Sequence, residues 1–357
     1  MKFSLGTAIV ALLAASAFAE PYMAVRTGFK CSQCHLNQTG GAGRTEYGQA
    51  YTQYKLVMTQ TQSLIKNSRS EGLTSFDPKL NDAVTIGANF RTEQYMSQKE
   101  GALAADNQHS ISEASVYFNI ELVKNFLSFY VDQSMGLTST SNNREMWMMA
   151  RNLPGNSYIK VGRTLLPYGF RIMDDQAFIR TNTGYGYGTF DLAGEIGFEP
   201  GPFSVVGNLT NTRFSSVGSV TFRNFRVGGS YAANTEGAKF SAYGPFAGAS
   251  YGRFTALAEF DLIEKASGDS TIKSAAQFYE LHFVPMQGTN LKTTYEYYDR
   301  NDKIANRRDG QQRITFGAEL FPIQYLQVGL YYRMNSFVPQ SDAGNQNTLI
   351  GRTHVFF

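Results

Sequence analysis

Apolar and polar side chains alternate along most of this chain, from about residue 83 to the C-terminus. Residues 84–90 read Val-Thr-Ile-Gly-Ala-Asn-Phe, with an apolar side chain at every second position, and residues 313–320 and 326–331 repeat the pattern. A period of two places successive side chains on opposite faces of a strand. The pattern therefore predicts a series of strands that each have one apolar and one polar face.

The lengths of the polar connections favour a barrel over a soluble sandwich. Short connections alternate with long ones, as they do when short turns join the strands at one rim of a barrel and long loops join them at the other. The short connections fall near Lys124, 154–155, 200–201, 234–235, 285–288 and Pro322, and the long ones span 97–108, 135–143, 165–190, 299–311 and 335–347. We therefore expect an all-β fold, a transmembrane antiparallel β-barrel of the bacterial outer membrane.

We count sixteen strands, an even number, as bacterial single-chain barrels have. Their predicted ranges are 83–96, 109–122, 126–134, 144–152, 156–163, 191–198, 202–211, 222–232, 237–243, 246–250, 252–264, 273–284, 290–298, 312–321, 324–334 and 347–357. The ninth and tenth are weak because Gly244-Pro245-Phe246 interrupts them, and fourteen is the alternative count. The final residues, 353–357, alternate and end on Phe357, which resembles the C-terminal assembly signal of outer-membrane barrels. This strand should pair with the first, because an open sheet edge cannot lie in lipid.

Alternation also predicts which ionisable side chains face the lumen of the barrel. They are Arg91, Glu93, Lys160, Glu259, Glu280, His282, Glu296, Arg313, Glu319, Arg333 and Arg352. Mixed charges in a lumen can hold water, pair with one another or contact a plug. The long loop 165–190 carries Arg171, Asp174, Asp175 and Arg180, and it either folds inward to constrict the pore or forms an ordered surface loop with internal Arg–Asp pairs.

Residues 1–19 have the features of a secretory signal peptide. Lys2 gives a basic start, an apolar run covers 8–15, and Ala17-Phe18-Ala19 is a small-x-small end, which predicts cleavage before Glu20. No later stretch is long and apolar enough for a transmembrane helix. Aromatic residues make up 14% of the chain, which suits the aromatic girdles of a membrane barrel. The net charge of +3 is too small and too scattered to indicate nucleic-acid binding.

The only two cysteines lie in one pentapeptide, Cys31-Ser32-Gln33-Cys34-His35. This C-x-x-C-H spacing is typical of covalent attachment of one c-type haem. Each thiol can form a thioether with a vinyl group of the porphyrin, and the adjacent imidazole of His35 can then serve as the proximal iron ligand. Haem is attached to such proteins on the exported side of the inner membrane, which agrees with the signal peptide.

Three other interpretations of the cysteine pair remain open. A structural zinc site usually needs four ligands, and the chain has no second cysteine pair. A thioredoxin-like pair would need a βαβ context, which the pattern does not show. A short-loop disulfide is the strongest alternative, because an exported chain meets an oxidising compartment.

The sequence divides into the signal peptide 1–19, a monohaem cytochrome c segment 20–80 and the barrel 81–357. Within 44–64, Tyr47, Tyr51, Tyr54 and Met58 recur at helical spacing, which predicts a short helix whose stripe packs either on a haem face or in a local aromatic core. Met58, Met23 and His109 are the candidates for the distal haem ligand, with Met58 preferred. His282 is a further candidate and His354 a weaker one.

The stretch 25–35, Val-Arg-Thr-Gly-Phe-Lys-Cys-Ser-Gln-Cys-His, leads through Gly48 into the barrel and resembles the fused cytochrome-porins. The best-known members of that family are outer-membrane iron oxidases. The resemblance implies a small monohaem segment at the periplasmic side of a barrel, or inside it, that moves electrons across the outer membrane. The residues that match the haem motif of the family are Cys31, Cys34 and His35.

These observations predict an electron-transfer protein of the outer membrane. It would pass electrons between an extracellular donor or acceptor, such as Fe(II), and a periplasmic c-type cytochrome or other carrier. Two alternatives come from other classes of protein. The chain could be a porin for small solutes whose cysteines form a disulfide, or a barrel sheath around a separate multihaem cytochrome.

Overall fold

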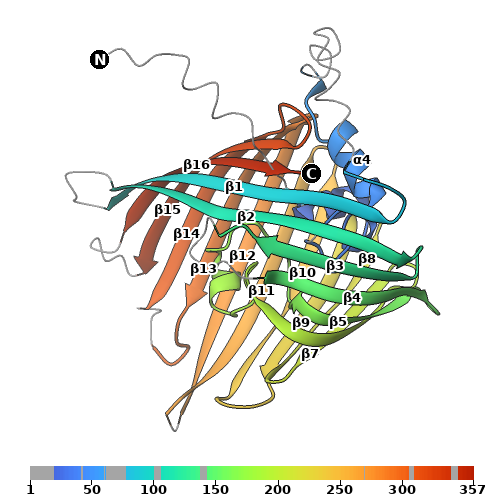
Figure 1. Cartoon of the computed structure of the whole chain (residues 1–357). Coiled ribbons are helices and arrows are strands. Elements are labelled where there is room, and N and C mark those ends of the chain that lie inside the picture. The colour runs from blue at the N-terminus through green and yellow to red at the C-terminus, as the bar shows by residue number, and fades with distance from the viewer. Residues whose placement is uncertain are drawn as a thin grey trace.

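The computed structural model describes residues 20–41, 43–59, 61, 78–99, 106–136, 143–268, 270–304, 309–338 and 345–357. It contains a closed antiparallel barrel in which sixteen strands follow one another in sequence order (Figure 1). The strands are β1 (Val84–Lys99), β2 (Asp106–Val123), β3 (Leu127–Ser134), β4 (Asn143–Leu153), β5 (Ser157–Leu165), β6 (Phe190–Phe198), β7 (Phe203–Thr210), β8 (Arg213–Phe222), β9 (Phe225–Asn234), β10 (Phe240–Tyr251), β11 (Phe254–Ser267), β12 (Ser270–Met286), β13 (Thr289–Asp299), β14 (Gly310–Leu320), β15 (Leu326–Val338) and β16 (Gln346–Phe356).

The barrel closes between its first and last strands, as the sequence predicts. β16 pairs with β1 from Asn89 opposite Phe356 to Lys99 opposite Gln346. This pairing satisfies the backbone N–H and C=O groups that would otherwise face lipid at an open edge.

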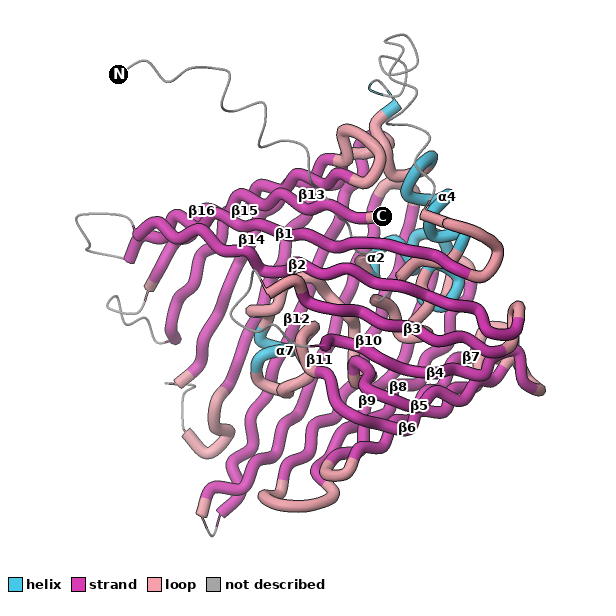
Figure 2. The backbone as a smooth tube through the Cα atoms, viewed as in Figure 1, coloured by secondary structure: helices cyan, strands magenta, loops and turns pink. Residues whose placement is uncertain are grey.

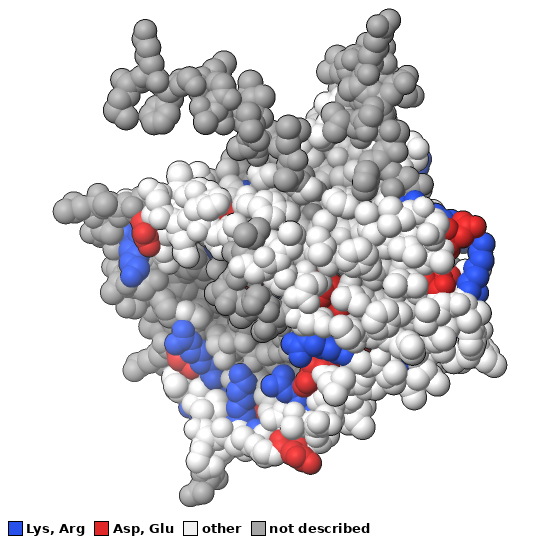
Figure 3. Space-filling model, viewed as in Figure 1, with Lys and Arg blue, Asp and Glu red and all other residues white. Residues whose placement is uncertain are grey.

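The wall is apolar outside and polar inside. On β6, Leu192 and Ile196 are more than 60% exposed, whereas Glu195 between them is fully buried in the lumen. The outer surface in Figure 3 is largely free of charged side chains over the strands, and the charges gather at its margins. A closed barrel with an apolar outer band is the architecture that spans an outer membrane. No helix in the described part of the chain is long and apolar enough to cross a membrane.

All the ionisable side chains predicted to face the lumen are buried there. Many of them are paired: Lys160 Nζ lies 2.7 Å from Glu195 Oε1, and Arg313 Nη2 lies 2.7 Å from Glu296 Oε1. A buried charge is tolerated when it is paired and hydrogen-bonded, which explains the mixture of signs in the lumen.

The predicted number of strands is correct, although one strand is missing from the prediction and another is divided into two. The segment Arg213–Phe222 is strand β8, which is not among the predicted strands because its Ser and Gly residues weaken the alternation. The predicted strands 237–243 and 246–250 are one strand, β10. Pro245 aligns with Gly229 of β9 but has no partner on β11, so the strand continues past the proline with its register unchanged.

The two rims of the barrel differ, as predicted, with one correction. The C-terminus and the short turns that follow the even-numbered strands lie at one rim, and the long segment 166–189 starts from the other (Figure 2). Asn234 and Thr235 belong to the long-loop rim, because the missed strand β8 reverses the direction of the chain before them. In bacterial barrels of this kind the short-turn rim faces the periplasm.

An N-terminal segment, residues 20–61, lies inside the barrel at the short-turn rim. It contains the helices α2 (Pro21–Thr27), α3 (Cys31–Cys34) and α4 (Glu46–Tyr54). Lys30 Nζ donates to the backbone oxygens of Glu199 and Phe203, and Met58 N donates to Phe321 O. These contacts with the β6–β7 and β14–β15 turns hold the segment across the periplasmic opening, and we call it the plug.

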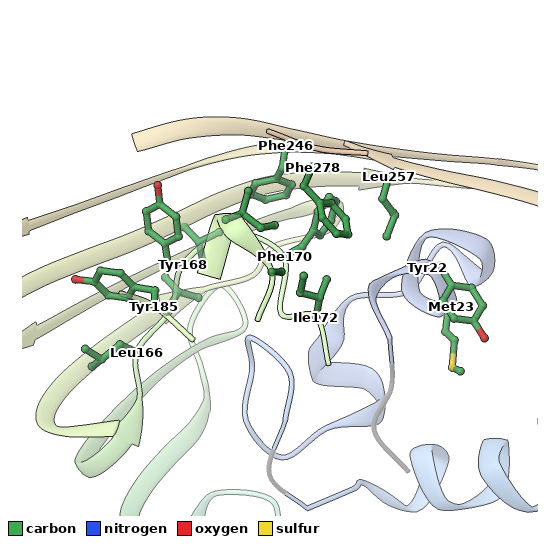
Figure 4. Close-up of a cluster of buried hydrophobic side chains, with 14 of the residues drawn as sticks. Tyr22, Met23, Leu166, Tyr168, Phe170, Ile172, Tyr185, Phe246, Leu257 and Phe278 are labelled. Atoms are coloured by element: carbon green, nitrogen blue, oxygen red, sulfur yellow. The ribbon is translucent and has the colours of Figure 1, made fainter. Parts of the chain in front are cut away.

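The long loop 166–189, which carries the short helix α7 (Phe178–Thr181), folds into the lumen from the opposite rim. Its apolar residues pack on the wall, and Figure 4 shows Phe170 and Ile172 beneath Phe246 and Phe278. The plug and this inward loop meet where the Arg171 guanidinium donates to Gly40 O. The structure thus selects the inward-folding alternative for this loop.

Candidate functional site

The C-x-x-C-H pentapeptide folds as one short helical turn followed by an extended residue. Lys30 caps α3, and its backbone N–H donates to Gln33 Oε1 at 2.9 Å. The chain leaves the helix at His35, which has φ −121° and ψ 148° and forms an antiparallel bridge with Arg44. His35 is 3% exposed, whereas both cysteines are half-buried. The three predicted haem residues therefore lie together in the plug, with the imidazole on the inner side.

The two cysteines are free thiols in this structure and do not form a disulfide. Burial raises the pKa of the Cys34 thiol to about 11, and the neighbouring Cys31 acts in the same direction. Cys34 is therefore protonated at neutral pH. The described residues contain no group of three or more His, Cys, Asp or Glu side chains that could hold a metal ion, which argues against a zinc site within them.

Two other helices complete the surroundings of the motif. α2 begins with Pro21 at its first position and ends at Gly28, whose φ of 71° places it in the left-handed region that glycine adopts readily. α4 begins at Thr45, whose hydroxyl accepts a hydrogen bond from Gly48 N at 3.1 Å. Its buried face is Gly48, Gln49 and Thr52.

Gly48 allows α4 to approach the haem motif closely. A Cβ at this position would lie 2.2 Å from the carbonyl oxygen of Cys34. We expect Gly48→Ala to force the two helices apart at a cost of about 1–3 kcal/mol, the range for overpacking. Limited proteolysis of the plug should become faster. Gly188→Ala is the matched control, because a Cβ there meets nothing within 4 Å. Equal proteolysis of both variants would contradict the close packing.

A cavity lies between the plug and the inward loop, inside the lumen. It encloses about 920 Å³ of empty space, part of which is open to solvent. Cys31, Cys34 and His35 line it on the plug side, and Phe170 and Met173 line it from the inward loop. Cofactor pockets usually have mostly apolar walls with a few polar groups. Two thiols, an imidazole, thioethers and aromatic rings are the groups that hold a c-type haem, so these residues fit that cofactor.

The structure separates the candidates for the distal ligand. Met23 is 5% exposed and lines the cavity, and in Figure 4 its side chain points away from the wall into the interior of the plug. Met58 lies at the periplasmic rim, where its backbone and Cγ contact the Gly288 turn, and it is not among the residues that line the cavity. Met173, which the sequence analysis did not single out, also lines the cavity.

The three histidines outside the motif do not line this cavity. His109 is exposed on β2. His282 Nε2 lies 2.7 Å from Glu280 Oε1, and its ring stacks on Tyr22 with 4.0 Å between centroids. His354 is held between Gln327 and Asn89. His282 and His354 therefore belong to the polar network of the wall.

The predicted aromatic stripe of the 44–64 helix is only partly a buried surface. Tyr51 borders the cavity, whereas Tyr47 is 47% and Tyr54 is 63% exposed. The helix ends before Met58, which removes that residue from the stripe. The buried face consists of small and polar residues because α4 packs against backbone at Gly48.

Ion pairs fix the inward loop above the cavity. Asp175 Oδ2 lies 2.8 Å from Arg91 Nη2, Asp174 pairs with Arg333, and Arg180 pairs with Glu259. Tyr168 donates to Asp261 Oδ1 at 2.8 Å. The loop is thus anchored inside the lumen, on the far side of the cavity from the plug.

The fold resembles solved outer-membrane porins. OmpT of Vibrio cholerae, in a form that lacks loop L8, superposes with a TM-score of 0.59 at 15% identity, covering 77% of this chain and 100% of that chain. The anion-selective porin of Comamonas acidovorans gives 0.59 at 11% identity over 77% and 99%. The channel DcaP of Acinetobacter baumannii gives 0.56 at 10% identity over 79% and 99%.

No protein-family model matches the sequence, and no curated protein matches it either. At these identities the solved structures bear on the fold alone. The chain is a porin-like outer-membrane β-barrel with its own N-terminal segment in the lumen.

Proposed function

We propose that this protein is a monohaem c-type cytochrome fused to a porin-like barrel, and that it transfers electrons across the outer membrane. The proposal rests on one observation: the complete C-x-x-C-H motif opens into a cavity inside the lumen, between the plug and the inward loop. The wall of such a barrel has an apolar band about 25 Å tall, which electrons do not cross quickly without a cofactor partway. A redox centre in this cavity would divide that distance.

The residues of the chain have distinct roles in this proposal. Haem c supplies a one-electron iron couple when it is bound. Cys31 and Cys34 would hold it through thioethers, formed by addition of each S–H across a vinyl double bond, which needs no leaving group and no oxidant. The imidazole of His35 would bind the iron. The partners would be a periplasmic c-type cytochrome or other carrier at the short-turn rim and a metal ion such as Fe(II), or another redox partner, at the long-loop rim.

We take Met23 as the distal ligand, because it is the cavity-lining thioether on the same segment as the haem motif. Met23→Leu should remove the near-infrared band of methionine-ligated ferric haem and lower the reduction potential, since methionine ligation raises it. Met173→Leu and Met58→Leu are the matched controls and should retain the band. Loss of the band in Met173→Leu alone would instead identify Met173 of the inward loop as the distal ligand.

The test of the main proposal is the absorption spectrum of the purified full-length protein. Soret and α bands would support a bound haem. Haem that stays with the polypeptide during denaturing electrophoresis would support its covalent attachment. Their absence would overturn the cytochrome proposal. Reduction of the haem on mixing with Fe(II) then tests the iron-oxidising version, and a haem that stays oxidised would exclude Fe(II) as the direct donor.

A solute channel is the second candidate, and the similarity of the fold to porins favours it. The plug and the inward loop argue against it, because both lie inside the lumen and narrow the space that a diffusion pore needs. The same occupied lumen argues against a sheath around a separate multihaem cytochrome. Planar-bilayer conductance of the intact protein separates a channel from a closed barrel.

A further inference from the structure

The cavity beside the haem motif carries an excess of positive charge. Arg44, Arg171 and Arg226 all line it, and they come from the plug, the inward loop and strand β9. The only carboxylate that lines it, within the described residues, is Glu20, and Lys292 Nζ already lies 3.7 Å from that side chain.

None of the three guanidinium groups forms an ion pair with a carboxylate among the described residues. Arg226 Nη1 lies 3.4 Å from Cys31 Sγ, and its Nε is buried without a hydrogen-bond partner there. Arg171 donates to the backbone oxygen of Gly40, and Arg44 lies over the ring of Phe356 at 4.4 Å. The contacts of these arginines are thus with neutral groups, and Arg226 Nε has no hydrogen-bond partner among the described residues.

This arrangement differs from that of the arginines elsewhere in the lumen. Arg91, Arg313, Arg333 and Arg352 each pair with an Asp or Glu. Burial lowers the pKa of the Arg44 and Arg171 guanidinium groups, as expected for charges that lack a counter-ion. Burying a charge costs several kcal/mol unless an opposite charge compensates it, so these positions favour an anionic ligand.

We propose that Arg44, Arg171 and Arg226 form an anion cradle that neutralises the two carboxylates of the bound haem. The inference rests on the proposed function, since it assigns the counter-charges of that same site. Guanidinium groups bind carboxylates through paired, charge-assisted hydrogen bonds. Two of these three arginines belong to the barrel, so the barrel and not the plug alone completes the haem site. A positive field next to the iron also favours its reduced form.

The test compares arginine variants of the full-length protein in two backgrounds. One background keeps Cys31 and Cys34, and the other is the double variant Cys31→Ala/Cys34→Ala, which cannot attach haem. Arg171→Gln and Arg226→Gln should lower the thermal midpoint of the haem-containing protein and raise it, or leave it unchanged, in the haem-free background. They should also shift the haem midpoint potential downward. Arg171→Lys should restore most of that potential, because it keeps the charge.

Arg253→Gln is the control, because Arg253 is exposed in the β10–β11 turn and does not line the cavity. If the arginine variants are destabilised equally in both backgrounds, or if the haem midpoint potential does not change, the arginines have only a structural role. Either result would overturn the proposed anion cradle. A parent protein without a Soret band would overturn the cradle together with the proposed function. A parent with covalent haem and an unchanged potential in the arginine variants would overturn the cradle alone.

Discussion

Replacing both Cys31 and Cys34 with serine is expected to abolish covalent haem attachment while leaving the barrel folded. The two thiols are the only ones in the chain, so no other side chain can form a thioether. The strand pairings lie outside the motif, and the closure of β1 on β16 does not involve it. Haem content, measured after denaturing electrophoresis, should fall from about one per chain to none. Circular dichroism should retain the β-sheet signal.

Ser32→Ala is the matched control within the same turn. Its hydroxyl donates to Glu199 Oε2 at 2.6 Å, so the variant removes a contact between the plug and the wall without touching a thiol. Haem content should stay at the level of the parent. Haem that remains covalently bound in the double serine variant would contradict the assignment of the attachment sites.

The barrel can be predicted from the sequence because the alternation of apolar and polar residues in each strand indicates which side chains face lipid and which face the lumen. Alternation places Arg313 and Glu319 inward and Phe316 outward with no information from the rest of the chain. The predicted strands are wrong where this alternation is weak. Ser and Gly residues interrupt it in β8, and Pro245 interrupts it in β10 although the strand continues. The pairing partners on either side, which the sequence does not display, hold these strands in place.

The proposal of haem attachment rests on a different kind of signal, because the spacing of the C-x-x-C-H motif is set by covalent chemistry within five residues. The surroundings of the motif could not be predicted, because they depend on contacts between distant segments. Arg226 on β9 reaches Cys31, and Arg171 reaches Gly40. The spacing of Met58 from Tyr51 and Tyr54 predicts a shared helical stripe, but α4 ends at Tyr54 and Met58 N donates to Phe321 O at the rim. The end of this helix cannot be predicted from local spacing, because it depends on contacts with turns that are distant in the sequence.

The plug and the inward loop occupy the lumen in series. The plug lies across the periplasmic side through contacts such as those of Lys30 and Met58 with the short turns. The inward loop lies on the far side of the cavity and is held by ion pairs of Asp174, Asp175 and Arg180. An electron carrier benefits from such a barrel, because it needs a path for electrons and no path for solutes.

Deleting residues 20–61 together with the change Arg180→Met is expected to convert a closed barrel into an open pore. Removal of the plug empties the periplasmic half of the lumen, and sixteen strands enclose a channel when nothing fills it. Arg180→Met leaves the buried Glu259 carboxylate without its cation, which costs about 3–5 kcal/mol and weakens the attachment of the inward loop to the wall. Single-channel conductance in planar bilayers should rise from near closed to the level of an open porin.

The single changes separate the contributions of the plug and the inward loop. Arg180→Met alone should conduct little, because the plug still lies across the periplasmic opening, and deletion of 20–61 alone should conduct partially, because the loop still constricts the lumen. Lys273→Met is the matched ion-pair control. Its partner Glu264 lies 3.1 Å away, but the lysine side chain is 55% exposed, so its loss should leave conductance unchanged. If the intact protein already conducts like an open porin, the plug and the inward loop do not seal the lumen. That result would favour a solute channel over the electron-transfer proposal.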